Sequence, residues 1–362
     1  MNLQEAYNKL SKQGGGILPL THKKYILEKP LNIHANNVRM IGQGSDKSIL
    51  EISGDNAIEL TQNGAALMLE NIKVVTLNPQ PKKGIGIYVY PKLTVDLNIV
   101  DCQFETVLNS IYYRNQPDKT SLGNICIRNS RFPQACIKTP REYYYEGLPH
   151  KVMLWGAKTE DKKLEIVYNQ FSKHPHQRQG AIELCIWGDP STGKGNGPYT
   201  LREGIVAHNT FNGATRECLA ISDHQKFVIA FNTINDSKRV GIYAIRGYRS
   251  IIHSNVVRGS LYRGHRLAHL RECVWTRNEV YNSGAEDNTK VGVGGMHISF
   301  SHNNTVTHNT IQATKGHAVA INNGSSGNYI AHNQILGNQS IVFVAKDSQT
   351  NQHDWDDFVL ES

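Results

Sequence analysis

Long apolar runs, linkers and low-complexity tracts are missing from this sequence of 362 residues. No stretch of 18 consecutive apolar residues is present, so neither a transmembrane helix nor a membrane partner is expected. No signal-peptide hydrophobic region is visible at the N-terminus. The length alone favours two domains, but without a Pro- or Ser-rich linker the sequence marks no boundary between them.

Cysteine is scarce, and its six residues form no CxxC pair. They are Cys102, Cys126, Cys136, Cys185, Cys218 and Cys273. This spacing argues against a metal site built from thiolates. We expect free thiols packed inside the fold, because a free cysteine behaves as a small hydrophobic side chain.

Acidic residues are outnumbered, since 39 Lys and Arg face 31 Asp and Glu, for a formal net charge of +8. The second half of the chain is rich in arginine, namely Arg202, Arg216, Arg239, Arg246, Arg249, Arg258, Arg263, Arg266, Arg271 and Arg277. A concentrated positive field favours an anionic polymer. No nucleic-acid-binding motif is present, so the expected partner is an acidic polysaccharide and not a nucleic acid. The alternative is that many of these arginines are solvated surface residues.

One short phrase repeats through the second half of the chain. It reads IVAHNTF, VIAFNTI, IIHSNVV, VWTRNEV, TVTHNTI and YIAHNQI, and its asparagines are Asn209, Asn232, Asn255, Asn278, Asn309 and Asn333. The first four asparagines lie 23 residues apart, and the last two lie 24 apart. A fixed period of this length is typical of a solenoid, in which each repeat buries its apolar face by stacking on its neighbours.

The repeat predicts an all-β fold, a single-stranded right-handed parallel β-helix. Its units are β-branched runs of four to six residues bounded by Asn, Gly and Ser, so a coil of 23 residues has room for three short strands. Asparagine tolerates the left-handed conformation of a tight turn. Its side-chain amide can also donate to the next coil and build a ladder. The alternative, a β-sandwich with regular turns, fits six in-phase asparagines poorly.

The first half of the chain fits the same repeat less regularly. Asn71, Asp101, Asn129 and Asn169 are taken as the equivalents of the repeated asparagine. Their wider spacing requires insertions, which we expect at residues 140–163, 187–203 and 282–294. Insertions in solenoids often gather on one face and build the binding site.

The ends of the chain are expected to cap a single β-helix domain over residues 1–362. Residues 1–20 form the N-terminal cap, with an amphipathic helix over 3–12 that covers the open sheet edge. Residues 345–362 form an acidic, non-repetitive tail.

Polar residues that follow equivalent strands are expected to stack in a column. They are Glu183, then Ser222, Asp223, His224 and Lys226, then Arg246, Tyr248 and Arg249, then His269 and Arg271, then Ser299, Ser301 and His302. Neighbouring coils lie about 4.8 Å apart, so groups two coils apart span one or two sugar rings. His, Tyr, Lys and Arg can remove a proton next to a uronate carboxyl and neutralise that carboxyl. The alternative is a polar turn column facing solvent.

Short motifs between about residues 167 and 283 follow one another in a distinctive order. The residues that carry them are Asn169, Phe171, Gly180, Glu183, Glu217, Ile221, Ser222, Asn232 and Arg246. In this order the stretch resembles the β-helix polysaccharide lyases of the chondroitinase B and alginate lyase family. The N-terminal GGGILPL and NNVRMIGQGSDKSIL are similar to the opening coils of pectate-lyase-like modules, including phage tailspike enzymes.

The resemblance implies a Lys base, an Arg acid one coil later, and a calcium ion held by acidic side chains against the uronate carboxyl. Arg246 matches the Arg, while His224 stands at the Lys position with Lys226 two residues on. Glu217 matches one calcium-binding acid, but Leu219 stands where a second is expected. Whether the protein uses calcium as a cofactor is therefore left open by the sequence. Arginines are able to replace the ion in neutralising the uronate carboxylate.

We therefore predict a polysaccharide lyase that cleaves an acidic, uronate-containing polysaccharide by β-elimination. The predicted base is His224 or Lys226, and the predicted proton donor is Tyr248 or Arg246. The predicted substrate-binding residues are Glu183, Asp223, Arg249, His269, Arg271, His302 and Trp187. A secreted, periplasmic or virion-associated location is expected, and homo-oligomerisation stays open.

Two other functions remain open. The first is a glycoside hydrolase or phage-type depolymerase with paired carboxylates, for which Glu183, Asp189, Glu217 and Asp223 are candidates. The second is a non-catalytic carbohydrate-binding β-helix. The DPHE signature of β-helix mannuronan epimerases is absent, as are the Asp-pair and His-Gly patterns of polygalacturonase-like hydrolases.

Overall fold

The computed structural model is nearly all-β, with one α-helix in the part of the chain that it describes. It describes residues 2–21, 24–52, 56–76, 84–106, 109–115, 121–133, 150–172, 182–188, 200–284, 294–312, 316–337, 340–348 and 350–353. The chain divides into two compact units, residues 1–189 and 190–362, and each is described by itself.

The first unit begins with the helix predicted over residues 3–12, which is confirmed as α1 (Leu3–Lys12). Asn2 and Glu5 close its N-terminus as a capping box, in which each side chain accepts from the other's backbone N–H. Leu3 and Tyr7 are buried, and the Tyr7 hydroxyl accepts a hydrogen bond from the Ala35 N–H at 3.1 Å. The helix therefore covers the apolar side of the first strands with one face.

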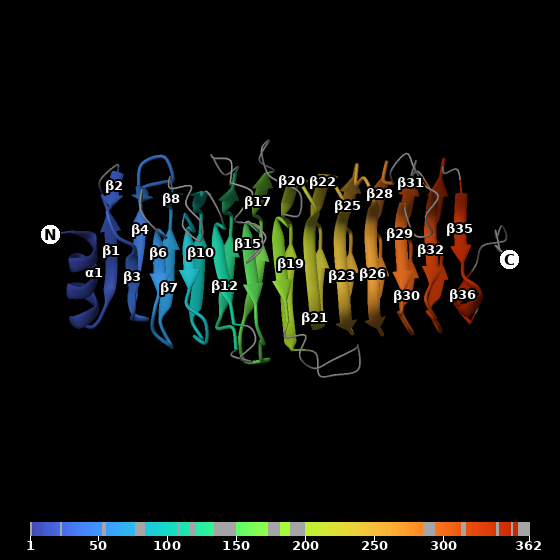
Figure 1. Cartoon of the computed structure of the whole chain (residues 1–362), viewed down its shortest axis with the longest axis horizontal. Coiled ribbons are helices and arrows are strands. Elements are labelled where there is room, and N and C mark those ends of the chain that lie inside the picture. Colours follow the sequence, from blue (N-terminus) through green and yellow to red (C-terminus); the bar gives the residue numbers. More distant parts are fainter. Residues whose placement is uncertain are drawn as a thin grey trace, which may run out of the picture. The chain divides into compact units, whose positions relative to one another are not determined.

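The strands of the first unit form three columns, in which each strand pairs in parallel with the strand three positions later (Figure 1). The first column contains β1 (Gly16–Leu20), β4 (Val38–Gly42), β7 (Ala66–Glu70), β10 (Asp96–Val100), β13 (Ile125–Arg128) and β16 (Leu164–Val167). The second contains β2 (Lys24–Leu27), β5 (Ile49–Ile52), β8 (Lys73–Thr76), β11 (Gln103–Glu105), β14 (Arg131–Phe132) and β17 (Gln170–Ser172). The third contains β3 (Leu31–Ile33), β6 (Ile58–Leu60), β9 (Ile87–Val89), β12 (Ile111–Arg114), β15 (Val152–Trp155) and β18 (Leu184–Trp187).

The second unit has the same three columns, and β21 is long enough to belong to two of them. The first column contains β19 (Leu201–Ala207), the end of β21 (Glu217–Ala230), β24 (Ile251–His253), β27 (Val274–Thr276), β30 (Thr305–Thr307), β33 (Tyr329–Ala331) and β36 (Gln352–His353). The second contains β20 (Thr210–Ala214), β22 (Thr233–Ser237), β25 (Val256–Arg258), β28 (Glu279–Tyr281), β31 (Thr310–Gln312) and β34 (Gln334–Leu336). The third contains the start of β21, β23 (Val240–Tyr248), β26 (Arg263–Arg271), β29 (Gly294–Ser299), β32 (His317–Asn322) and β35 (Ser340–Val344). Three strands per repeat and parallel pairing agree with the sequence prediction.

The repeated asparagines of the second unit form a buried ladder, as predicted. The Asn232 N–H and side-chain Nδ2 both donate to Asn255 Oδ1, at 3.0 and 2.9 Å. The same Nδ2 also donates to the Val206 carbonyl at 2.9 Å. This pattern continues to Asn278, Asn309 and Asn333. Each rung thereby satisfies buried polar groups of its neighbours. Leaving such groups without a hydrogen bond would cost free energy of folding.

The left-handed turn does not lie on these asparagines, so that part of the prediction is wrong. The residues in front of them have the positive φ, namely His208, Phe231, Ser254, Arg277, His308 and His332, with φ between 53° and 57°. In the first unit Asn71, Asp101 and Asn129 themselves have positive φ and occupy the turn, whereas Asn169 follows Tyr168 at φ 60° and points inward. The first three are therefore not equivalents of the ladder asparagine.

A second ladder went unnoticed in the sequence because its asparagines lie outside the repeated phrase. Asn304 donates to Asn328 Oδ1 at 2.8 Å, and Asn328 donates to Asn351 Oδ1 at 2.7 Å. Asn304 Oδ1 in turn accepts from the Cys273 N–H at 2.9 Å. The second unit thus has two corners at which side-chain amides join successive coils.

The interior is apolar, and four of the five described cysteines are buried as predicted, whereas Cys126 lies in an outward row. Cys102, Cys185, Cys218 and Cys273 are buried free thiols, and Cys126 is a half-buried one. Burial raises the pKa of Cys102 and of Cys273 to about 12, so both stay protonated and unreactive. Cys136 lies outside the described residues. Within the described ranges, no helix has the length and apolar character needed to span a bilayer.

The predicted insertions lie only partly within the described residues. Residues 140–149, 189–199 and 285–293 fall outside them. Strand β15 lies within the predicted insertion at 140–163, where it pairs with β12 and β18. In the predicted tail, Lys346–Ser348 form a 3-10 turn before β36, and residues 354–362 are not described.

We expect Asn255→Ala to lower the free energy of unfolding by about 3 kcal/mol, because the Asn232 amide groups and the Ile229 carbonyl lose their partner in the core. Urea denaturation followed by circular dichroism measures this loss. The control is Asn235→Ala, whose amide bonds Asn212 at the surface and should cost below about 1 kcal/mol. Equal losses in both variants would contradict a structural role for the ladder.

Candidate functional site

Polar side chains gather on the outer face of β21, β23, β26 and β29 in the second unit. One outward row contains Ala220, Tyr243, Arg266 and His297, which are register partners on the four strands. Three residues further along the chain a second row follows, formed by Asp223, Arg246, His269 and Phe300, and Asn323 continues it after β32. All five residues of that second row have φ between 50° and 57°. The left-handed bend fixes their direction at a cost of about 1 kcal/mol each, which the surrounding sheet must outweigh.

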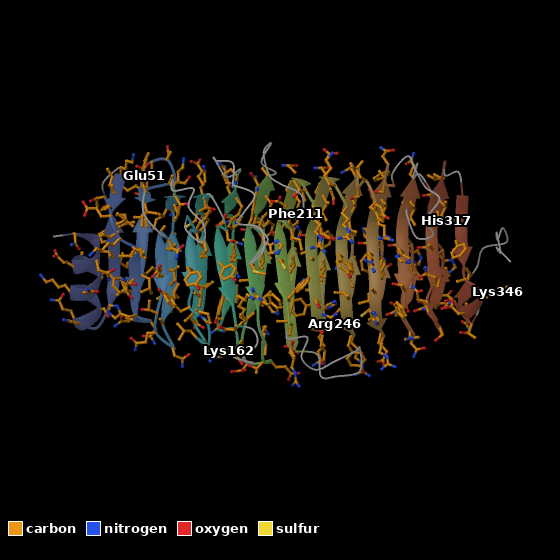
Figure 2. All side chains as sticks on the ribbon, in the orientation of Figure 1. Glu51, Lys162, Phe211, Arg246, His317 and Lys346 are labelled. Atoms are coloured by element: carbon orange, nitrogen blue, oxygen red, sulfur yellow. The ribbon has the colours of Figure 1, made fainter. Side chains whose placement is uncertain are left out.

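Asp223 and Arg246 form a bidentate ion pair in this second row. Arg246 Nε donates to Asp223 Oδ1 at 2.6 Å, and Nη2 donates to Oδ2 at 2.8 Å and to Ser222 Oγ at 2.7 Å. The hydrogen bonds to Asp223 raise the pKa of Arg246. Figure 2 places Arg246 near the end of β23. The pair holds the guanidinium in one orientation and cancels much of its charge.

His269 lies beside this pair and is able to accept a proton. Its ring stacks on Phe300, with centroids 4.7 Å apart and planes within 2°. Partial burial lowers the pKa of His269, and the charges of Arg246, Arg266 and His302 lower it further. The imidazole is therefore neutral near pH 7, the state that a general base requires.

Two arginines, Arg263 and Arg266, lie on β26, the same strand as His269. The Arg266 guanidinium lies 4.9 Å from the centroid of the Tyr243 ring, and its buried Nε has no hydrogen-bond partner among the described residues. Burial lowers the pKa of Arg263 to about 10, and the charges of Arg266 and Arg239 add to this effect. Several positive charges close together and partly shielded from water favour binding of an anion.

His297 completes the group. Burial lowers its pKa to about 4, with Arg263 and Arg266 as neighbouring charges. Its Nε2 lies 3.0 Å from Asn322 Oδ1. We call Tyr243, Arg246, Arg263, Arg266, His269 and His297 the cationic face.

No sequence pattern singled out Tyr243 or His297, and Arg263 and Arg266 stood out only as part of the arginine surplus. Tyr243, Arg266 and His297 each lie three residues before the bend that follows them, so the position of the bend would have identified them as outward. The position of the bend could not be predicted, because the residues that adopt the positive φ in this row share no residue type.

His224 lies in the core and not on this face. Its side chain is fully buried, and Nδ1 contacts Ser250 Oγ at 2.9 Å. Burial alone lowers its pKa to about 3. A Cβ on Gly247 would meet the ring at 2.4 Å, so the next coil needs a glycine there. The bend at Asp223 turns the following residue inward, which separates His224 from Asp223 and His269.

The other residues predicted from the column form a separate surface row. Tyr248, Arg271 and His302 are register partners. Beyond them Lys226 pairs with Glu203 at 3.2 Å and Arg249 pairs with Glu272 at 2.8 Å, with all four side chains exposed. Exposed pairs of this kind contribute little to stability, because solvent and salt screen them. His302 Nδ1 contacts Ser326 Oγ at 2.8 Å, and partial burial lowers its pKa.

Glu217 is buried at the other end of β21, where Arg216 and Arg239 lie 2.9 and 3.7 Å from its carboxylate. Burial raises its pKa against the effect of both arginines. Asp223 is six residues further along the strand, roughly 20 Å away at the usual rise. No group of three or more His, Cys, Asp or Glu within the described ranges is placed to hold a metal ion. The donor set around Glu217 therefore does not fit calcium.

Two predicted residues belong to the first unit. Glu183 is fully buried, and its carboxylate lies 3.1 Å from Lys151 Nζ. Trp187 meets Trp155 edge to face with centroids 5.5 Å apart, and the Arg114 guanidinium lies 4.4 Å from the Trp155 centroid. Asp189 falls outside the described residues.

Comparison with known proteins gives one family match. Residues 191–358 match the model of the periplasmic copper-binding protein NosD family. No curated protein matches. The His, Cys, Asp and Glu side chains described here form no cluster of three that fits copper, so copper has no part in the chemistry proposed below.

Solved structures resemble the chain over nearly its whole length. DFA-IIIase from Arthrobacter chlorophenolicus A6 is 14% identical with a TM-score of 0.57, over 97% of this chain and 89% of that one. The structure of its complex with GF2 is 13% identical with a TM-score of 0.54, over 97% of this chain and 87% of that one. The A-module of the mannuronan C-5 epimerase AlgE6 from Azotobacter vinelandii is 11% identical with a TM-score of 0.44, over 98% and 95%. The likeness to DFA-IIIase shows a shared fold and no more.

We expect acid to unfold the protein because of its buried histidines. His224 and His265 have pKa values of about 3 when folded, against about 6.5 when unfolded. Below about pH 6.5 the unfolded chain takes up protons that the folded chain refuses, so stability falls by about 1.4 kcal/mol per pH unit for each histidine until about pH 3. Denaturation at a series of pH values should show a shallower slope in His265→Leu. The exposed His308→Leu is the control, and an unchanged slope in His265→Leu would contradict burial of a neutral ring.

We expect Arg266→Gln to move the pKa of His269 upward, toward the usual value of about 6.5. The reason is that the arginine's charge disfavours the imidazolium. Titration of the His269 ring protons by NMR measures the shift, with Lys346→Gln as a control for loss of one distant charge. A pKa that stays the same or falls would show that the two groups do not interact.

Proposed function

We propose that the protein is a carbohydrate-active enzyme that cleaves a uronate-containing polysaccharide by β-elimination. The coils would be those of a right-handed parallel β-helix, with the cationic face as the active site. One observation carries the proposal: a neutral imidazole, His269, lies among arginines on the outer face of successive strands. A lyase needs a base and a carboxylate clamp, and this face offers both.

The clamp would consist of Arg266 with Arg263. Burial and then repulsion from Arg266 lower the pKa of Arg263, and a uronate carboxylate placed against these guanidinium groups would relieve the repulsion. It would also accept from the buried Arg266 Nε, which has no partner within the described part of the chain. Neutralising the carboxylate acidifies the proton on C5, which is the first requirement of the reaction.

His269 would remove the C5 proton. The C4–O bond then breaks, a C4–C5 double bond forms, and Tyr243 donates its hydroxyl proton to the leaving oxygen. Tyr243 is suited to this role because the Arg266 cation lies over its ring. Asp223 would act as a positioning residue that holds Arg246 next to His269. His224 in the core and Lys226 in its surface pair are less suited to the base that the sequence suggested.

A hydrolase with paired carboxylates is less well supported. Asp223 is bound by Arg246, Glu217 is bound by two arginines, and the strand rise separates the two acids by roughly 20 Å. An inverting pair needs about 6.5–9.5 Å between its carboxyl groups. We place the protein in the periplasm or outside the cell, on the strength of the description of the matching family.

The test is absorbance near 232 nm during incubation with a panel of acidic polysaccharides, because the unsaturated product absorbs there. His269→Ala should lower the rate by about 10²–10⁴-fold. His308→Ala is the matched control, since His308 is an exposed histidine at another corner and should keep full activity. New reducing ends without absorbance would move the case to a hydrolase, and binding without turnover would leave a carbohydrate-binding protein.

A further inference from the structure

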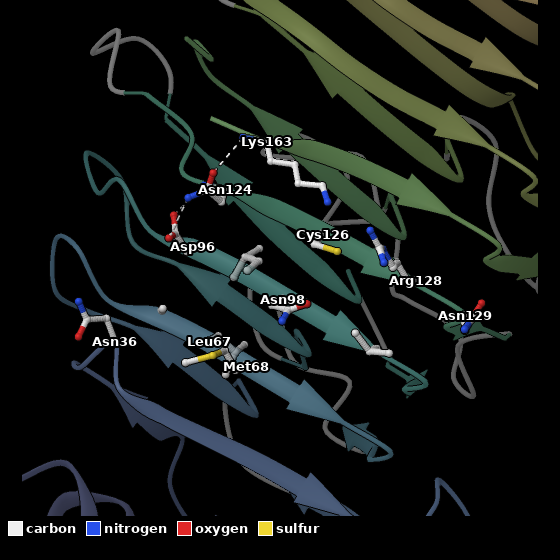
Figure 3. A pocket seen from close by; sticks show the side chains of 13 residues that line it. Asn36, Leu67, Met68, Asp96, Asn98, Asn124, Cys126, Arg128, Asn129 and Lys163 are labelled. Carbon is white, nitrogen blue, oxygen red and sulfur yellow. Dashed lines mark hydrogen bonds between the residues drawn. The ribbon is translucent and has the colours of Figure 1, made fainter. Parts of the chain in front are cut away.

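A hollow of about 710 Å³ lies on the outer face of β7, β10, β13 and the start of β16 in the first unit (Figure 3). Its floor is the outward row Met68, Asn98 and Cys126, which are register partners on three strands. This row is separate from the cationic face, which belongs to the second unit. Neither the repeat nor any motif in the sequence pointed to it.

One rim of the hollow is a fixed chain of hydrogen bonds. Asn124 donates to Asp96 through its backbone N–H at 2.7 Å and through Nδ2 at 3.1 Å. Asn124 Oδ1 accepts from the Lys163 N–H at 2.9 Å (Figure 3). Because both amide ends of Asn124 are engaged, the rim keeps its shape before any ligand arrives, which lowers the entropy lost on binding.

The charges around the hollow are already compensated. Lys163 Nζ lies 2.6 Å from Glu165, and Arg128 also pairs with Glu165. Asp96 is held by the two hydrogen bonds from Asn124. With two cations and two carboxylates, this surface offers no excess charge to an anionic ligand, in contrast to the cationic face.

The floor offers groups that suit a hydroxylated ligand. The Asn98 side chain is exposed, and within the described part of the chain it makes no hydrogen bond. An amide both donates and accepts, as a sugar hydroxyl does. Met68 beside it provides an adaptable apolar surface for the C–H face of a sugar ring.

An adjoining hollow of about 350 Å³ extends the surface. It shares Arg128 and Asn129 with the first and ends at Tyr168, whose side chain is 56% exposed. An exposed aromatic ring at the end of a polar groove is the combination that binds amphipathic ligands, with one apolar face and one wet edge.

We propose that this groove binds neutral sugar residues of a glycan. The proposal rests on the proposed function in taking the ligand to be a carbohydrate, and it adds that the substrate is a heteropolysaccharide with neutral residues as well as uronates. The balanced charge, the free Asn98 amide, the apolar Met68 and the exposed Tyr168 favour such a ligand over an acidic one.

The experiment measures binding of neutral hexasaccharides of the gluco, manno, galacto and fructo series to the full chain by calorimetry. Asn98→Trp fills the floor of the groove and should weaken binding at least tenfold, and Asn98→Ala should weaken it less. Gln334→Trp, on the exposed face of β34, is the matched control and should bind as the original chain does. Thermal unfolding of each variant checks that the fold is kept.

Two results would overturn the proposal: no binding of any neutral hexasaccharide, or equal binding by Asn98→Trp and Gln334→Trp. The absorbance assay with short uronate oligosaccharides is run on the same variants and should be unaffected by Asn98→Trp. Neutral-sugar binding without any turnover would refute the proposed lyase activity but support the proposed binding groove. Turnover without neutral-sugar binding would refute the groove and leave the lyase.

Discussion

The asparagine ladder is the interaction on which the second unit depends. Each rung satisfies a backbone N–H and a carbonyl of neighbouring coils at a corner that water does not reach. A coil whose rung slipped by one residue would leave these groups unpaired, so the ladder fixes the register as well as adding stability. The outward rows of the second unit inherit their alignment from this register.

The left-handed corners decide which side chains the aligned coils present. In one row of the second unit the bend falls on Asp223, Arg246 and His269, and the next residue of each strand turns inward. Two histidines that are close in the repeat thereby receive opposite environments. His269 is partly exposed among arginines, and His224 is buried with a pKa of about 3. The chemistry available at the surface follows from the backbone geometry at these corners.

The two units present different surfaces, although both are built from columns of parallel strands. The cationic face crowds guanidinium groups around a neutral imidazole, and the groove of the first unit balances Lys163 and Arg128 against Glu165. The charges of the cationic face suit an acidic polymer. The groove of the first unit suits uncharged hydroxyl groups. A heteropolysaccharide combines both chemistries.

The sequence by itself determined the repeat, its three strands per coil, the capping helix and the asparagine ladder, because period and residue type specify which positions stack on one another. It also placed Asp223, Arg246 and His269 at equivalent positions. Only the tertiary structure decided the direction of each side chain. A single positive φ reverses which face the next residue occupies, and residues as different as Asp, Arg, His and Phe adopt it here. For this reason His224 could not be assigned to the core, nor Tyr243 and Arg266 to the surface, before the coils were seen stacked.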